Sequence, residues 1–174
     1  MKYGLLSQII FWGQKIKYGE TLQPAYWWGK SPWLLFGLQV FYRCLDRGAL
    51  NKSLKALVGL RVSQLNQCAF CSDLSLATLK KLNISEQKIK SLGQYATSSD
   101  FTPTERTVLA YGDAMTKNEP TAHILKTLKT VFSEKDIIEL TAWIAFQNMS
   151  SKFNAALNIP AQGFCWPRDD IFSK

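Results

Sequence analysis

Apolar residues recur every three or four positions along most of this chain, and this spacing limits the fold more than any other feature of the sequence. Such spacing is typical of one face of a helix, whereas a half-buried strand alternates every two residues. None of the patterned segments shows a clean two-residue alternation. We therefore predict an all-α fold, a compact multi-helix domain that spans residues 1–174.

Two of the predicted helices have well-marked starts. Thr102 precedes Pro103 and stands three residues before Glu105, which is the pattern of an N-cap, a proline in the first turn and a capping box. Ser133 and Asp136 form the same kind of box before an apolar stripe. Further helices are predicted over residues 34–48, 51–66, 68–82 and 85–96, and after Pro120.

The amino-terminal part of the chain is rich in aromatic and other apolar side chains. Residues 1–20 are expected to form an amphipathic helix. Residues 20–33 contain two prolines and a glycine and are expected to form an irregular connection to a buried helix over residues 34–48. The side chains expected to face the core from the first helix are Leu5, Ile9, Ile10, Trp12 and Ile16.

Charge and composition exclude several classes of partner. The formal charge at pH 7 is +8, but the lysines are scattered over predicted helix surfaces, so nucleic acid is not expected as a partner. No apolar stretch approaches the roughly 20 residues of a membrane span. Residues 1–20 lack a small-residue cleavage site after their apolar patch. We expect a cytoplasmic protein without a membrane span.

The pair Cys68 and Cys71 is the strongest functional signal. It lies in the stretch NQCAFCSDLSLATLKKLN, where a loop turns into a helix near Gln67. The amino end of a helix presents unpaired N–H groups that stabilise a thiolate. One sulfur can attack an oxidised substrate and the other can then close a disulfide. The pair predicts a redox site, provided that the sulfurs lie close enough to bond and open enough to meet an oxidant. The spacing does not say which cysteine attacks.

Three other interpretations fit the same pair. A zinc site needs four ligands, and Cys44 and Cys165 lack a second ligand at a suitable spacing. A purely structural disulfide is disfavoured because so short a loop gives little stabilisation. Alternatively, the two cysteines are small buried apolar residues. The redox interpretation is favoured, no metal or cofactor is expected, and Cys165 and Trp166 are expected to be packed instead of reactive.

The segment LVGLRVSQLNQCAFCSDL resembles the signature of the carboxymuconolactone decarboxylase-like, or alkyl hydroperoxidase D-like (AhpD-like), proteins. The resemblance covers roughly residues 35–164 and includes EKDIIELTAWIAFQNMSSKFNAALNIPAQGF as the closing helix and tail. It implies an all-helical fold, a homo-oligomer and thiol-dependent peroxidase or disulfide-reductase activity, with Cys68 and Cys71 as catalytic residues. A hydroperoxide or disulfide would be the substrate, and a thiol compound the electron donor.

The resemblance is incomplete at two positions. The family's active pattern has a Glu twelve residues before the first cysteine and a His four residues after the second, and these positions here are Ala56 and Ser75. Neither residue can act as a base near pH 7. Ser75 shares a helix face with the cysteines and can support a sulfur by hydrogen bonding, and Asp73 is a second supporting candidate that projects to another side of the helix. Lys55 and Arg61 could lower a thiol pKa if they pointed inward, but they are expected to be solvated.

In the family pattern, the Glu and the His form a proton relay, which activates the thiol. These observations predict an oxidoreductase of the antioxidant, peroxidase type, whose activity is weakened because the two relay positions are occupied by Ala56 and Ser75. The alternative is a non-catalytic, oligomeric binding or scaffold member of the family. Lactone decarboxylation is not expected, because proton chemistry of that kind needs positioned acids and bases. Four aromatic residues are expected at a subunit contact in preference to a substrate pocket, namely Tyr26, Trp27, Trp28 and Trp33.

Overall fold

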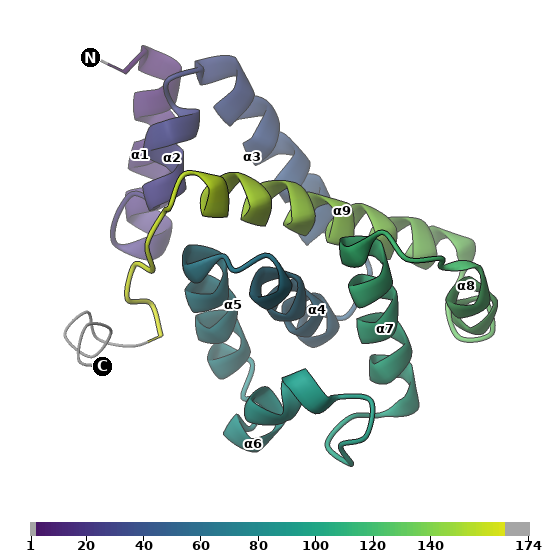
Figure 1. The fold of residues 1–174 in the computed structure, drawn as a ribbon. Coiled ribbons are helices and arrows are strands. Elements are labelled where there is room, and N and C mark those ends of the chain that lie inside the picture. The colour runs from purple at the N-terminus through teal and green to yellow at the C-terminus, as the bar shows by residue number, and fades with distance from the viewer. Residues whose placement is uncertain (1–2, 166–174) are drawn as a thin grey trace. The chain divides into compact units, whose positions relative to one another are not determined.

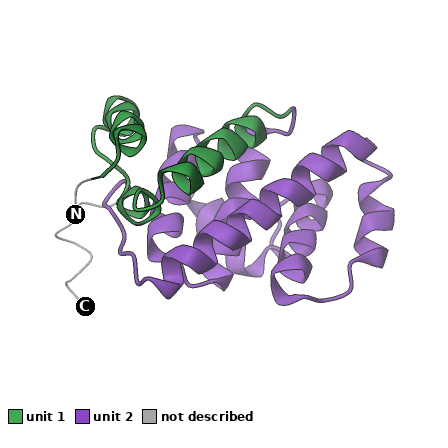
Figure 2. Cartoon of the chain, turned by 90° about the horizontal axis from the view of Figure 1, so that it is seen from above, with its two compact units in different colours: residues 1–48 green, residues 49–174 purple. Residues whose placement is uncertain are grey.

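The computed structural model describes residues 3–165, and every regular element within that range is a helix (Figure 1). The prediction of an all-α fold is confirmed. The chain divides into two compact units, residues 1–48 and 49–174 (Figure 2). That the two units form a single domain stays a prediction.

The first unit contains three helices around a small apolar cluster. They are α1 (Leu5–Tyr18), α2 (Gln23–Trp28) and α3 (Pro32–Asp46). Phe11, Ala25 and Leu35 form the buried centre of the cluster. Helix α2 corrects the prediction that residues 20–33 are irregular. Its proline stands in the first turn, where the missing N–H would have no partner within the helix anyway.

The predicted core face of α1 is wrong except for Ile10, which packs against the apolar cluster. The buried residues of the helix are Ser7, Phe11 and Gln14. The two polar side chains are buried because they bind backbone groups of their own unit: Ser7 donates to the Gly29 carbonyl at 2.9 Å, and Gln14 accepts from the Leu22 N–H at 3.1 Å. Four of the residues expected to face the core are more than half exposed, namely Leu5, Ile9, Trp12 and Ile16.

Helix α3 is also less buried than predicted. Its buried residues are Leu35 and Leu45. Five of its apolar side chains are exposed, namely Trp33, Leu34, Phe36, Val40 and Phe41. The first unit therefore has a large apolar surface, of the kind that marks an interaction site on a soluble protein.

The second unit is built around α4. Its elements are α4 (Lys52–Leu65), α5 (Ala69–Lys81), α6 (Glu86–Lys90), the 3₁₀ helix η1 (Ser91–Gln94), α7 (Pro103–Lys117), α8 (Ala122–Leu128) and α9 (Glu134–Ala156). Helix α4 packs against α5, α7 and α9 (Figure 1). Leu57, Val58, Leu60 and Val62 of α4 are fully buried, which makes this helix the core of the unit.

Both predicted capping boxes are present. The Thr102 N–H donates to Glu105 at 2.8 Å, and the Glu105 N–H donates to the Thr102 hydroxyl at 3.2 Å. Ser133 and Asp136 make the same reciprocal pair at the start of α9. These boxes satisfy backbone donors that have no partner within the helix, so they fix where α7 and α9 begin.

Helices α4 and α7 approach each other closely at Gly112. A Cβ at this position would lie 2.7 Å from a methyl carbon of Val58, closer than carbon atoms tolerate without a shift. Glycine therefore permits the contact that holds α4 in place. The carboxyl end of α4 leads directly to the cysteine pair.

Candidate active site

The loop between α4 and α5 turns the chain sharply before Cys68. Asn66 caps the end of α4, and Gln67 adopts the left-handed backbone conformation with a φ of 52°. The Cys68 N–H then donates to the Ser63 carbonyl at 2.9 Å. These contacts place Cys68 at the N-cap of α5, where the sequence predicted it.

Polar side chains from distant helices hold this loop. The Asn66 Nδ2 donates to Asn148 Oδ1 at 3.0 Å and to Ser151 Oγ at 2.8 Å. Asn148 in turn donates to Thr116 Oγ1 on α7 at 3.0 Å. The end of α4 is thus tied to α7 and α9, and the position of Cys68 is fixed with it.

Cys68 and Cys71 are joined by a disulfide, with their Cα atoms 5.3 Å apart. The Cys68 Sγ also accepts a hydrogen bond from the Cys71 N–H at 3.1 Å. That N–H belongs to the first turn of α5, whose backbone donors lack partners within the helix. The helix start therefore acts on this sulfur as it would on a capping oxygen, in an environment that favours negative charge.

The cysteine pair is buried within the chain. Cys68 is 1% exposed and Cys71 is 7% exposed. Phe70, which stands between them, is also buried and lies edge to face with Phe164, at 6.3 Å between ring centres. The sulfurs are close enough to bond, as the redox prediction required, but they are not open to solvent in the way that it also required.

Asn154 of α9 contacts the pair and is absent from the residues predicted above. Its Nδ2 donates to the Cys71 Sγ at 3.2 Å across 83 positions of sequence, and its side chain is 3% exposed. A signal for it existed, because Asn154 continues the helical spacing of Ile137, Leu140 and Ile144, which are all buried. A polar residue on a buried stripe needs a hydrogen-bond partner.

The two positions of the missing relay lie on α4 and α5. Ala56 is buried, and Ser75 is half-buried. Ser75 faces α4 and α9, because a Cβ added to Gly59 would lie 3.8 Å from the Ser75 Oγ and 3.5 Å from the Gln147 Nε2. Hydrogen bonds to the sulfurs come from the Cys71 N–H and from the amide of α9, and none within residues 3–165 comes from Ser75.

Asp73 is bound to the tail that follows α9. It is 5% exposed. Both of its carboxylate oxygens accept hydrogen bonds from the tail. This is consistent with the prediction that Asp73 and the two sulfurs lie on different sides of α5. It accepts hydrogen bonds of 2.8 to 3.0 Å from four consecutive backbone N–H groups, those of Gln162, Gly163, Phe164 and Cys165.

Lys55 and Arg61 of α4 are not solvated, in contrast to the prediction. Arg61 makes two hydrogen bonds of 2.7 Å with the carboxylate of Asp113, which raise the pKa of the guanidinium. Lys55 is 5% exposed, and its Nζ lies 5.9 Å from the ring centre of Trp143. Both are enclosed because α4 is central and its neighbours α7 and α9 cover it.

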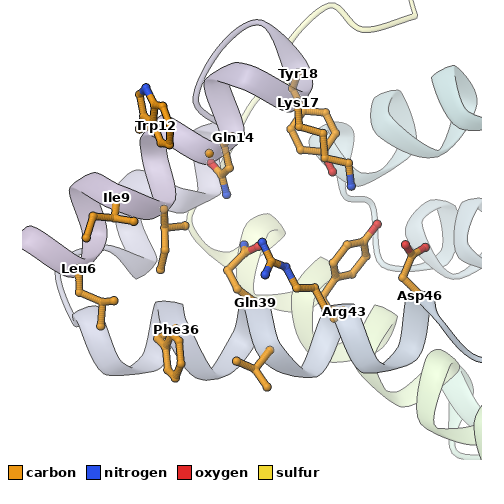
Figure 3. Close-up of a pocket in the computed structure, with 14 residues that line it drawn as sticks. Leu6, Ile9, Trp12, Gln14, Lys17, Tyr18, Phe36, Gln39, Arg43 and Asp46 are labelled. Atoms are coloured by element: carbon orange, nitrogen blue, oxygen red, sulfur yellow. The ribbon is translucent and has the colours of Figure 1, made fainter.

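A cavity of about 430 Å³ lies in the first unit, lined by residues of α1 and α3. Figure 3 shows Leu6, Ile9 and Phe36 toward one end, and Lys17 and Asp46 toward the other. The cysteine pair does not line this cavity. Nor do the four aromatic residues considered above for a subunit contact or a pocket, Tyr26, Trp27, Trp28 and Trp33.

The remaining thiols form no site with the pair. Cys44 and Cys165 are free cysteines. Within residues 3–165 no group of three His, Cys, Asp or Glu side chains is placed to hold a metal ion. The same range has no helix with the length and apolar character needed to cross a membrane. Trp166 lies outside the described residues.

The fold and the site define an all-helical protein with a Cys-x-x-Cys disulfide at a helix start. The family model of the carboxymuconolactone decarboxylase family matches residues 32–114. The uncharacterized protein YnjA of Escherichia coli K12 is 34% identical over 168 residues, which are 94% of this chain and 92% of YnjA. The chain belongs to the carboxymuconolactone decarboxylase (AhpD-like) family, as the sequence resemblance predicted.

Two solved structures extend the comparison. A protein of unknown function from Agrobacterium tumefaciens, named as a candidate antioxidant defence protein AhpD, matches with a TM-score of 0.73 and 25% identity, over 78% of this chain and 94% of that one. The apo debrominase Bmp8 matches with a TM-score of 0.80 and 21% identity, over 95% of this chain and 89% of that one. At this identity the likeness to Bmp8 shows the fold alone.

Proposed function

We propose that the chain is a thiol–disulfide redox protein with alkylhydroperoxide reductase-type peroxidase activity through Cys68 and Cys71. The observation that carries the proposal is the bonded sulfur pair in the first turn of α5, where a backbone N–H donates to Cys68. The likeness to the Agrobacterium protein, a candidate antioxidant defence protein, supports the same chemistry.

The reaction begins from the reduced pair. One thiolate attacks the terminal oxygen of a hydroperoxide R–O–OH, the O–O bond breaks, and the departing alkoxide takes a proton from water to give ROH. The sulfur that made the attack now carries a hydroxyl group, as S–OH. The second cysteine attacks this sulfur, the disulfide forms, and its S–H proton leaves with the hydroxyl group as water. A dithiol donor then reduces the disulfide and is itself oxidised to a disulfide.

Turnover is expected to be slow because the acid–base relay is missing. Ala56 and Ser75 supply no ionisable group where the family pattern has Glu and His. A thiol with a pKa of about 8.5 is only a few per cent thiolate at neutral pH. Protons must therefore come from and return to water. Because the pair is buried, small hydroperoxides should react faster than bulky ones.

The test is steady-state hydroperoxide consumption with a dithiol donor. Cys68→Ser and Cys71→Ser should each abolish it, because each variant lacks one of the two sulfurs that the cycle needs. Cys44→Ser, which changes an exposed free cysteine, should leave the rate unchanged. Equal consumption by the parent and both variants of the pair would refute the proposal.

The burial of the pair favours a second candidate function. Cys68 and Cys71 are buried, and a buried Ala56 stands at one relay position, which suits a binding or scaffold protein that has kept the fold without the chemistry. This candidate predicts no hydroperoxide or disulfide turnover in the parent protein. Turnover that depends on the pair excludes it.

We also propose that the chain forms a homo-oligomer through the apolar surface of α1 and α3. Ile16 and Trp33 are 67% and 77% exposed on these helices, and aromatic residues are enriched at subunit contacts. Ile16→Glu and Trp33→Glu should lower the molar mass measured by light scattering. Val131→Glu, at a 54% exposed position of the second unit, is the control and should not. A monomeric parent would contradict the proposal.

A further inference from the structure

We propose that Asn154 belongs to the redox site, where its amide stabilises the Cys71 thiolate once the disulfide is reduced. The inference rests on the proposed function and deepens it, because it assigns a partner to one sulfur of the pair. It starts from a contact between α9 and α5 that joins residues 83 positions apart.

The side-chain amide of Asn154 lies within hydrogen-bonding distance of the Cys71 sulfur. The Asn154 Nδ2 lies 3.2 Å from the Cys71 Sγ, and both side chains are more than nine-tenths buried. A hydrogen bond to a charged acceptor is stronger than one to a neutral acceptor, and it favours the charged form of that group. The contact with Cys71 should therefore strengthen when the sulfur becomes a thiolate.

The other end of the same amide has no partner. The Asn154 Oδ1 is buried and accepts no hydrogen bond within residues 3–165. Most buried polar atoms in proteins are paired, so a lone acceptor beside a reactive sulfur is a signal of function. Reduction of the disulfide creates S–H donors at this place. An amide carries both a donor and an acceptor. Its N–H can therefore donate a hydrogen bond to a thiolate, and its oxygen can accept one from a thiol.

Three charged side chains of α4 and α5 have partners other than the sulfurs. Asp73 is engaged by the tail, and Arg61 is bound to Asp113. Lys55 stands over the ring of Trp143.

The charged residues of α9 also lie apart from this contact. Glu139 is paired with Lys135 at 3.9 Å, and Lys152 is exposed. The two sulfurs thus accept hydrogen bonds from different donors. The Cys68 sulfur accepts from the backbone N–H of Cys71, and the Cys71 sulfur accepts from the side-chain amide of Asn154. Asn154 supplies anion stabilisation at a site that lacks the Glu and His of the family pattern, but it cannot take a proton as a base.

The test measures the pKa of Cys71 alone. The full chain with Cys44, Cys68 and Cys165 changed to Ser leaves one thiol, whose thiolate is followed by its ultraviolet absorbance as the pH is raised. Asn154→Ala should raise the pKa of Cys71 by about one pH unit, since it removes a hydrogen bond to a charged group. Asn154→Asp should raise it further, because a carboxylate repels the thiolate.

Met149→Ala is the matched control. It also shortens a side chain of α9, but one that is 44% exposed and carries no N–H donor, so it should leave the pKa unchanged. Equal pKa values of Cys71 in the parent, Asn154→Ala and Met149→Ala would overturn the inference. Should Asn154→Ala fail to fold, Asn154→Leu, which has a similar side-chain size but no N–H donor, decides by the same titration.

The titration needs no hydroperoxide, so its outcome is separable from that of the peroxidase assay. A pKa that depends on Asn154 in a protein without turnover would support the inference and refute the proposed peroxidase. Turnover that depends on the pair, with a Cys71 pKa that Asn154 does not affect, would support the proposed peroxidase and refute the inference about Asn154.

Discussion

The Asp73 Oδ2 accepts a hydrogen bond of 2.8 Å from the backbone N–H of Gly163, and this contact joins the helix of the cysteine pair to the tail. Three neighbouring N–H groups of the tail bind the same carboxylate. The tail also brings Phe164 against Phe70, which stands between the two cysteines. Asp73 therefore braces α5 from a side that does not carry the sulfurs.

Asp73→Ala should lower the free energy of unfolding by roughly 2–4 kcal/mol, because it leaves four backbone donors without their charged acceptor. Chemical denaturation measures the change. Glu86→Ala is the control, since that carboxylate is 72% exposed in a 3.8 Å ion pair and should contribute about 0–1 kcal/mol. A loss for Asp73→Ala no larger than that of the control would show that the brace is unimportant.

The ion pair of Arg61 and Asp113 should be coupled in folding. The two side chains are 15% and 11% exposed and join α4 to α7 through two hydrogen bonds. A double-mutant cycle with Arg61→Ala and Asp113→Ala should give an interaction energy of about 1–3 kcal/mol, because either single change removes both 2.7 Å hydrogen bonds of a largely enclosed charge. Additive effects of the two substitutions would contradict this prediction.

Restoring the relay should increase peroxidase activity. The double substitution Ala56→Glu and Ser75→His places an acid–base pair at the positions of the family pattern, and general acid–base catalysis contributes about 10²–10⁴-fold. Hydroperoxide consumption per protein measures the gain. Lys126→His adds a histidine to a distant helix and is the control, which should give none. An unchanged rate in the double variant, together with an active parent, would point to a base elsewhere in the chain.

Local signals in the sequence predicted much of the second unit. Thr102 with Glu105, and Ser133 with Asp136, marked the starts of α7 and α9, because a capping box involves residues only three positions apart. The helix start at Cys68 was predicted from another local pattern, the change from a loop to a helix near Gln67. A cytoplasmic location and a single domain stay predictions.

Contacts between distant residues could not be predicted in this way. The amphipathic pattern of α1 shows that Ile9 and Trp12 form an apolar surface, but it does not say that Ser7 and Gln14 find backbone partners and occupy the buried side. The partners of Asp73 lie 89 to 92 positions further along the chain. Periodicity places a residue on a face of its own helix and gives no information about which segment covers that face.

The central claim, that Cys68 and Cys71 cycle between dithiol and disulfide, is tested most directly by a single turnover. The fully reduced protein is mixed with one equivalent of hydroperoxide, and the bonds are identified by peptide mass spectrometry with and without a dithiol. We predict that one hydroperoxide is consumed per chain, that a Cys68–Cys71 disulfide forms, and that the dithiol reverses it. Hydroperoxide that remains unconsumed, with both thiols still free, would contradict the account.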